Sequence, residues 1–161
     1  METVGSIFDK LSILEKRMRS INEKINNLNL DLELKSNVSI NNLDKTLVQL
    51  NNQRGWLIRE LGRIIVSIGN KERPAIFKKH KVYDKDVKED RTSDLLSLIL
   101  LLDIVNGNLW GLEDKRRDTT LSDKERLAAA DAVSIDNKKR NDLIDKIDEL
   151  IDFSMKVSIH D

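Results

Sequence analysis

The stretch IFDKLSILEKRMRSINEKINNL, residues 7 to 28, carries an apolar stripe that decides how the chain can fold. Its apolar side chains recur at alternating spacings of four and three residues, at Ile7, Leu11, Leu14, Met18, Ile21, Ile25 and Leu28. This spacing places them along one face of an α-helix, as in the seam of a coiled coil. The stripe predicts a long amphipathic helix that buries this face against other helices.

Composition favours helices in the rest of the chain as well. The 161 residues are enough for one domain with its own core, and only 4% of them are aromatic while 35% are charged. Strand-forming residues are scarce, whereas Leu, Ile, Lys, Glu and Asp are abundant. Because the chain has no cysteine, disulfides, thiol catalysis and thiolate metal sites are excluded. We expect a single all-α domain.

Charge and hydropathy argue against several classes of partner. Lys plus Arg number 28, as do Asp plus Glu, so no net field directs the chain to nucleic acid or to an anionic membrane. The longest apolar run, LLSLILLLDIV at residues 95–105, is short for a membrane span and contains Asp103. The N-terminal segment is amphipathic and carries acids, unlike a signal peptide. We expect a cytoplasmic protein without a nucleic-acid or membrane partner.

Three more helices follow from the same periodicity. The second is expected from near Ser39 to a C-cap at Gly69–Asn70. The third is expected to start at Thr92 or Ser93 and to include the apolar run. Each of these helices carries an apolar face that requires a packing partner.

The fourth helix opens with SDKE, in which Ser122 and Glu125 have the spacing of a capping box. Short turns within each pair of helices and one long connection between the pairs indicate an antiparallel four-helix bundle built from two helical hairpins. The expected hairpins are residues 1–70 and 92–158, joined within one domain by a crossover loop at 71–91.

Two arginines interrupt the apolar seams of the second and fourth helices. Arg54 follows Asn51 by three residues, and Arg140 follows Asn137 by the same spacing. The spacing places each Asn on the face of its Arg, one turn earlier. An unpaired buried charge costs several kcal/mol, so each arginine must meet a carboxylate or a water-filled cleft.

The distance of each arginine from the turn of its hairpin indicates which acids could lie opposite it in a regular bundle. At about 1.5 Å per residue, Arg54 lies roughly 20 Å, and Arg140 roughly 25 Å, from the turn at the shared end of the hairpins. The matching levels hold Glu15 on the first helix and Asp103 on the third. We therefore expect the arginines, these acids and the two asparagines to form one central layer, in which Asp103 pairs with Arg140.

This layer has two main interpretations. It can be a buried ion-pair layer that sets the register of the helices. It can instead be a cleft in which Arg54 and Arg140 hold a phosphate or carboxylate while Glu15 or Asp103 acts as the catalytic acid or base. A third arrangement, in which the helix phases differ and both arginines extend to solvent, stays open.

The connection FKKHKVYDKDVK, residues 77 to 88, gathers several lysines, Lys81 among them, around Tyr83. It can serve as a lid that brings cations to an anionic ligand. It can equally be a solvated crossover whose tyrosine anchors it on the bundle. No His–carboxylate spacing and no Gly-rich phosphate loop accompany it, so we expect neither a metal nor a cofactor.

Trp110, Glu113 and Arg117 share one face of the third helix by their spacing. As a binding cluster they would contact a ligand. As a structural cluster the indole would pack on the other hairpin, and Glu113 would pair with Arg116 or Arg117.

The segment NLWGLEDKRRDTTLSDKERLAAADAVSIDNKKRNDLIDKIDEL, residues 108 to 150, resembles the bacterial family catalogued as domain of unknown function 4254. Gly111 stands where such proteins often carry His, and Ile135–Asp136 replaces a commoner Leu-Asn. The opening GSIFDKLSILEKR is similar to the Asp-Lys-Leu-Ser-Ile start of those proteins. The resemblance implies an all-helical fold and an association with glycan-biosynthesis loci. The matching positions are Leu109, Trp110, Glu113, Asp114, Arg117, Asn137, Arg140, Asn141, Asp142, Leu143 and Ile144.

Two functions from different classes fit these features. The first is a protein-interaction or self-associating module, because the seam of the first helix and the apolar third helix are stripes of the kind that pair between chains. The alternative is a small helical enzyme or binding protein for an anionic metabolite, such as a sugar phosphate or a nucleotide sugar, with the arginines as a clamp.

Overall fold

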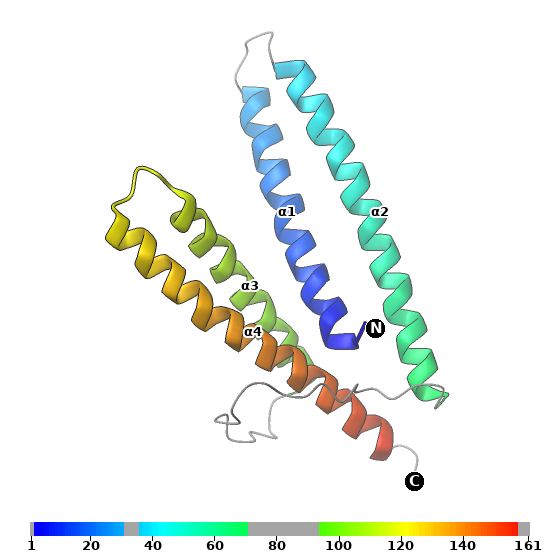
Figure 1. The fold of residues 1–161 in the computed structure, drawn as a ribbon. Helices are drawn as coiled ribbons and strands as arrows, with labels where there is room; N and C mark the ends of the chain where they lie inside the picture. The colour runs from blue at the N-terminus through cyan, green and yellow to red at the C-terminus, as the bar shows by residue number, and fades with distance from the viewer. Residues whose placement is uncertain (1, 31–35, 71–93, 158–161) are drawn as a thin grey trace.

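The chain forms an all-α bundle in a computed structural model that describes residues 2–30, 36–70 and 94–157. Within these ranges there are four helices and no strand: α1 Val4–Leu30, α2 Ser36–Gly69, α3 Leu95–Arg117 and α4 Asp123–Val157. Neighbouring helices α1 and α2 lie side by side with opposite chain directions, as do α3 and α4 (Figure 1). The predicted all-α fold is confirmed, while the expected crossover loop at 71–91 lies outside the described residues.

The start of α3 differs from the sequence prediction. Asp94 has extended backbone angles (φ −74°, ψ 162°) and is the N-cap, so α3 begins at Leu95 rather than at residue 92 or 93. The Asp94 carboxylate accepts hydrogen bonds from the Ser97 N–H at 2.8 Å and from its hydroxyl at 3.1 Å. It thereby satisfies the Ser97 N–H, a backbone donor that has no partner inside the helix. The side chain of an earlier residue could not reach this donor.

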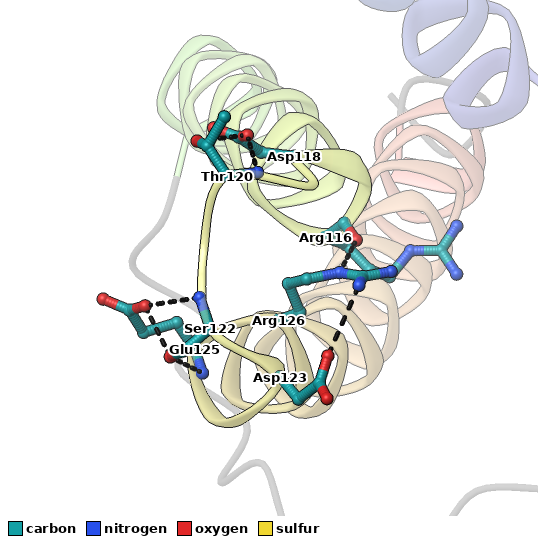
Figure 2. Close-up of polar contacts among 7 residues, drawn as sticks. All are labelled: Arg116, Asp118, Thr120, Ser122, Asp123, Glu125 and Arg126. Carbon is teal, nitrogen blue, oxygen red and sulfur yellow. Dashed lines mark hydrogen bonds and ion pairs between the residues drawn. The ribbon is translucent and has the colours of Figure 1, made fainter.

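The start of α4 agrees with the predicted capping box (Figure 2). The Ser122 N–H and hydroxyl donate to Glu125 Oε2 at 2.9 and 2.6 Å, and the Glu125 N–H donates to Ser122 Oγ at 3.4 Å. Arg126 Nε also donates to the carbonyl of Arg116 at 3.2 Å, which joins the first turn of α4 to the last turn of α3. The turn between the two helices is therefore held at both ends.

The main hydrophobic core lies where all four helices meet, near the start of α1. A second cluster, of Leu14, Met18 and Leu50, belongs to α1 and α2 only. The two hairpins thus pack together at one end and separate toward their turns, and α1 contacts each of the other three helices (Figure 1). The buried residues of the main core are Val4, Ile7, Leu57, Ile64, Ile68, Leu98, Leu102 and Ile147.

The first turn of α1 lies directly against α4. The Gly5 N–H donates to Asp148 Oδ1 at 2.7 Å in a buried contact between residues 143 positions apart. A Cβ on Gly5 would lie 2.4 Å from the backbone oxygen of Ile144, far inside normal contact. Glycine therefore allows the two backbones to approach, and Asp148 accepts a donor that the first turn of α1 cannot satisfy internally. Its negative charge also suits the positive end of the α1 dipole.

We expect Gly5→Ala to lower the free energy of unfolding by about 2–3 kcal/mol, because the added methyl group forces the α1 and α4 backbones apart. Gly62→Ala on α2 is the matched control, since a Cβ there meets nothing within 4 Å. That change should raise stability by about 0.5–1 kcal/mol through the lower backbone entropy of alanine. Urea unfolding followed by circular dichroism measures both effects. Equal stabilities for the two variants would contradict the close approach of α1 and α4.

Hydrogen bonds lower the pKa of two carboxyls at the α3–α4 turn. The Asp118 carboxylate accepts from the Thr120 hydroxyl at 2.6 Å and from its N–H at 2.8 Å, which holds the pKa of Asp118 below its ordinary value of 3.8. The Ser122 hydroxyl and N–H lower the pKa of Glu125 below 4.5 in the same way. Both folded pKa values lie below the unfolded ones. The stabilisation is therefore present above the ordinary pKa and is lost as the pH falls through the lowered one.

Glu125→Gln should distinguish the contribution of the Glu125 charge to stability from that of the capping hydrogen bonds, because glutamine also completes a capping box but does not ionise. The stability difference between wild type and this variant should be larger at pH 7 than at pH 3, as measured by urea unfolding at both pH values. Asp131→Asn, an exposed change in the first half of α4 beyond the capping box, controls for the loss of one negative charge. A difference that does not change with pH would show that the ionised Glu125 contributes nothing to the cap.

Candidate functional site

The two seam arginines belong to separate ion pairs. Arg54 Nε on α2 lies 2.8 Å from Glu15 Oε1 on α1, and these side chains are 46% and 47% exposed. Arg140 Nε on α4 lies 3.6 Å from Asp9 Oδ1 on α1, and these side chains are 29% and 12% exposed. Arg54 thus meets the acid that depth along the bundle selected, but it does so near the surface, whereas Arg140 meets a different acid.

Asp103 has other partners. Its Oδ1 accepts from the Ser12 hydroxyl at 2.7 Å and from Lys16 Nζ at 2.8 Å. Partial burial acts to raise the pKa of Asp103, but the hydrogen bonds from Lys16 and Ser12 and the nearby positive charges lower this pKa overall. The predicted Asp103–Arg140 pair is wrong, because Asp103 lies on the side of α3 that faces α1 rather than α4.

A buried polar contact joins α1, α3 and α4, and we call Asp9, Asn106 and Arg140 the polar triad. Asn106 Nδ2 donates to Asp9 Oδ1 at 3.1 Å, and both residues are buried. Asn106 Oδ1 and Arg140 Nε are buried without a hydrogen-bond partner among the described residues. Unpaired buried atoms offset much of what the ion pair contributes, so the triad favours one orientation of the hairpins more than it adds stability.

The remaining members of the expected central layer are also placed differently. Asn51 is exposed on α2, and Asn137 is half-buried on α4. Residues at equal distances from the turns of the two hairpins do not lie side by side in this fold, because the hairpins separate toward their turns. The two arginines consequently lie at different helix contacts, one between α1 and α2 and the other between α1 and α4.

Glu113 is occupied by pairs within its own helix. Its Oε2 accepts from Arg116 Nε at 3.0 Å and Nη2 at 2.8 Å, and Arg117 Nη2 lies 3.3 Å away. Trp110, on the same helix, is partly exposed. The expected lid residues Lys81 and Tyr83 lie outside the described residues.

Asn106 is not among the site residues that the sequence predicts, although the sequence contains a signal for it. The buried residues of α3 are Leu98, Leu102, Asn106 and Leu109, at spacings of four, four and three. An asparagine on the core-facing line of an apolar helix requires a polar partner. In the structure this partner of Asn106 is the Asp9 carboxylate on α1.

The side of α3 that faces away from the core is apolar and exposed, and we call Leu96, Leu100, Ile104, Gly107 and Gly111 the outer face of α3. Leu96, Leu100 and Ile104 are 64%, 55% and 58% exposed. None of the five residues carries a charge, and a Cβ on Gly111 would meet nothing within 4 Å. Contiguous exposed apolar surface of this kind is typical of interaction sites.

By length and composition, α3 is also the one helix in the described part of the chain that could cross a membrane. Its 23 residues extend well beyond the apolar run at 95–105 on which the sequence expectation depended. Within the described ranges, no group of three or more His, Asp or Glu side chains is placed to hold a metal ion. No family model, curated protein or solved structure matches the chain.

We expect Arg140→Leu to lower the free energy of unfolding by about 2–3 kcal/mol, because it leaves the buried Asp9 carboxylate without a positive charge. Asp9→Asn in the same chain should recover at least half of this loss, since the amide oxygen still accepts from Asn106 and no charge is left. Arg54→Leu is the control at an exposed pair and should cost under about 1 kcal/mol. Urea unfolding of the variants gives the coupling energies. Coupling of Arg140 to Asp103 rather than to Asp9 would contradict the polar triad.

Proposed function

We propose that the protein is a self-associating helical module and that copies meet through the outer face of α3. The observation that carries this proposal is an exposed line of Leu96, Leu100 and Ile104 without any charge on it. Together these side chains present an apolar surface on the order of a few hundred Å², which is comparable to the largest patch on a typical monomer, and such patches are often functional. By contrast, the apolar stripe of α1 is used inside the protein, against the other three helices.

Asp103 favours a protein partner over the interior of a lipid bilayer. It borders the outer face at the middle of α3, is half exposed, and accepts hydrogen bonds from Lys16 and Ser12. These contacts lower the pKa of Asp103, so the carboxylate is ionised at neutral pH. A charge at the centre of a membrane span is costly, whereas the rim of a protein interface tolerates one.

The alternative, an arginine clamp for an anionic metabolite, has less support. Arg54 and Arg140 each already have a carboxylate partner, Glu15 or Asp9. The two pairs belong to different helix contacts, and a clamp needs both guanidinium groups to point at one ligand. We therefore propose that the polar triad orients the hairpins, and this orientation determines how α3 is presented to a partner.

We also propose that the module acts in the cytoplasm.

Self-association predicts that wild-type protein forms a dimer or larger assembly at high micromolar concentration, as measured by sedimentation velocity. Leu100→Glu should shift this equilibrium toward monomer at least tenfold, because it buries a carboxylate in an apolar contact. The monomer should remain folded, since Leu100 is exposed.

Val48→Glu on α2 is the matched control, because this residue is equally accessible but lies away from α3. It should associate as the wild type does. A wild-type protein that stays monomeric at every concentration, or a Leu100→Glu variant that associates like the wild type, would contradict the proposed function.

A further inference from the structure

We propose that two copies pair through α3 in an antiparallel arrangement, each placing Leu96 and Leu100 against Gly111 and Gly107 of the other. This inference rests on the proposed self-association and adds the partner, a second copy of this chain, and the register of the contact. A second copy is the expected occupant of the outer face because the shape of α3 is complementary to a reversed copy of itself.

The shape of the outer face differs between the two halves of α3. Leu96 and Leu100 project from the first half, whereas Gly107 and Gly111 leave the second half low. A Cβ on Gly111 would meet nothing, and one on Gly107 would meet only the end of the Lys16 side chain, at 3.4 Å. Glycines on a helix surface let another helix approach closely. A reversed copy therefore fits Leu96 over Gly111, and Leu100 over Gly107 beside the end of the Lys16 side chain.

The spacing of these residues allows both contacts at once. Leu96 and Gly111 are equally far along the chain from the point between Asp103 and Ile104, and so are Leu100 and Gly107. A two-fold axis through that point brings each leucine to the level of a glycine of the other copy. The contact is then isologous and closed, so association stops at two chains. A parallel pairing would set leucine on leucine and leave the glycines facing a gap.

The dipole of α3 also favours the antiparallel pairing. Reversal sets the helix dipoles of the two copies antiparallel, whereas a parallel pairing would place like ends of the dipoles side by side. Asp103 approaches the axis from both copies, but each arrives with its own Lys16, 2.8 Å away, so the local charge is balanced.

Because the chain has no cysteine, single cysteines can report the register directly. Ser97→Cys and Asn108→Cys are suitable, since both residues are exposed at the margin of the outer face and leave the leucine and glycine contacts intact. With a short bismaleimide, a mixture of the two full-length variants should give mainly mixed cross-links. Either variant alone should give few, because its two cysteines lie far apart along the axis. Val48→Cys on α2 is the control and should stay uncross-linked.

Gly111→Leu gives a second measurement that does not depend on cross-linking. Since nothing lies within 4 Å of a Cβ at this position, the variant should melt no lower than the wild type at concentrations where both are monomeric, yet its dimer dissociation constant should rise at least tenfold. Gly62→Leu on α2, where the surroundings are equally open, should dimerise as the wild type does. Normal dimerisation of Gly111→Leu would overturn the proposed register.

The outcomes separate this inference from the proposed function. Self-cross-links of Ser97→Cys in a stable dimer would overturn the antiparallel register while leaving self-association in place. A monomer in sedimentation that forms no cross-link would overturn both. A wild-type monomer that binds neutral phosphatidylcholine vesicles would overturn both as well and would assign the outer face of α3 to lipid.

Discussion

The fold depends on the close contact between the first turn of α1 and the second half of α4. Gly5 can donate its N–H to Asp148 only because it has no side chain to hold the α4 backbone away. This contact lies beside the main core, to which Ile7 and Ile147 both belong, and brings Asp9 to the level of Arg140. A buried carboxylate that meets a helix N-terminus is favourable only at one alignment, so the contact sets both the distance and the register between the hairpins.

From this alignment follows an asymmetric bundle. The hairpins share a core at one end, whereas toward the turns each pair of helices packs mainly on itself. The polar triad lies where α1, α3 and α4 meet, and two of its buried atoms have no hydrogen-bond partner in the described part of the chain. Such a group is poorly suited to stabilise the fold, but it penalises alternative alignments that would leave Asp9 or Asn106 entirely unpaired. We therefore propose that the polar triad orients the hairpins.

The same geometry explains why the polar candidates give weaker support for a function than the apolar surface does. The candidate acids and arginines are used in pairs between helices or within one helix, as with Glu113. In contrast, α3 is packed on its inner side against α4 and α1, and nothing in the described residues covers Leu96, Leu100 and Ile104. The first half of α3 carries apolar residues on every side, and such a helix normally lies buried on every side; here a second copy of the chain would complete that burial.

The sequence by itself determined what depends on neighbours in the chain. The stripe from Ile7 to Leu28 predicts α1, and the spacing of Ser122 and Glu125 predicts the capped start of α4, because helix periodicity and capping act within a few residues. Only the tertiary structure decided which acid meets Arg140. That choice depends on the angle between the hairpins, and this angle depends on the contact of Gly5 with α4, more than a hundred residues away. The sequence also does not predict which side of α3 is exposed. The first half of this helix has apolar residues on every side, so its pattern has no periodicity that shows which side faces the core.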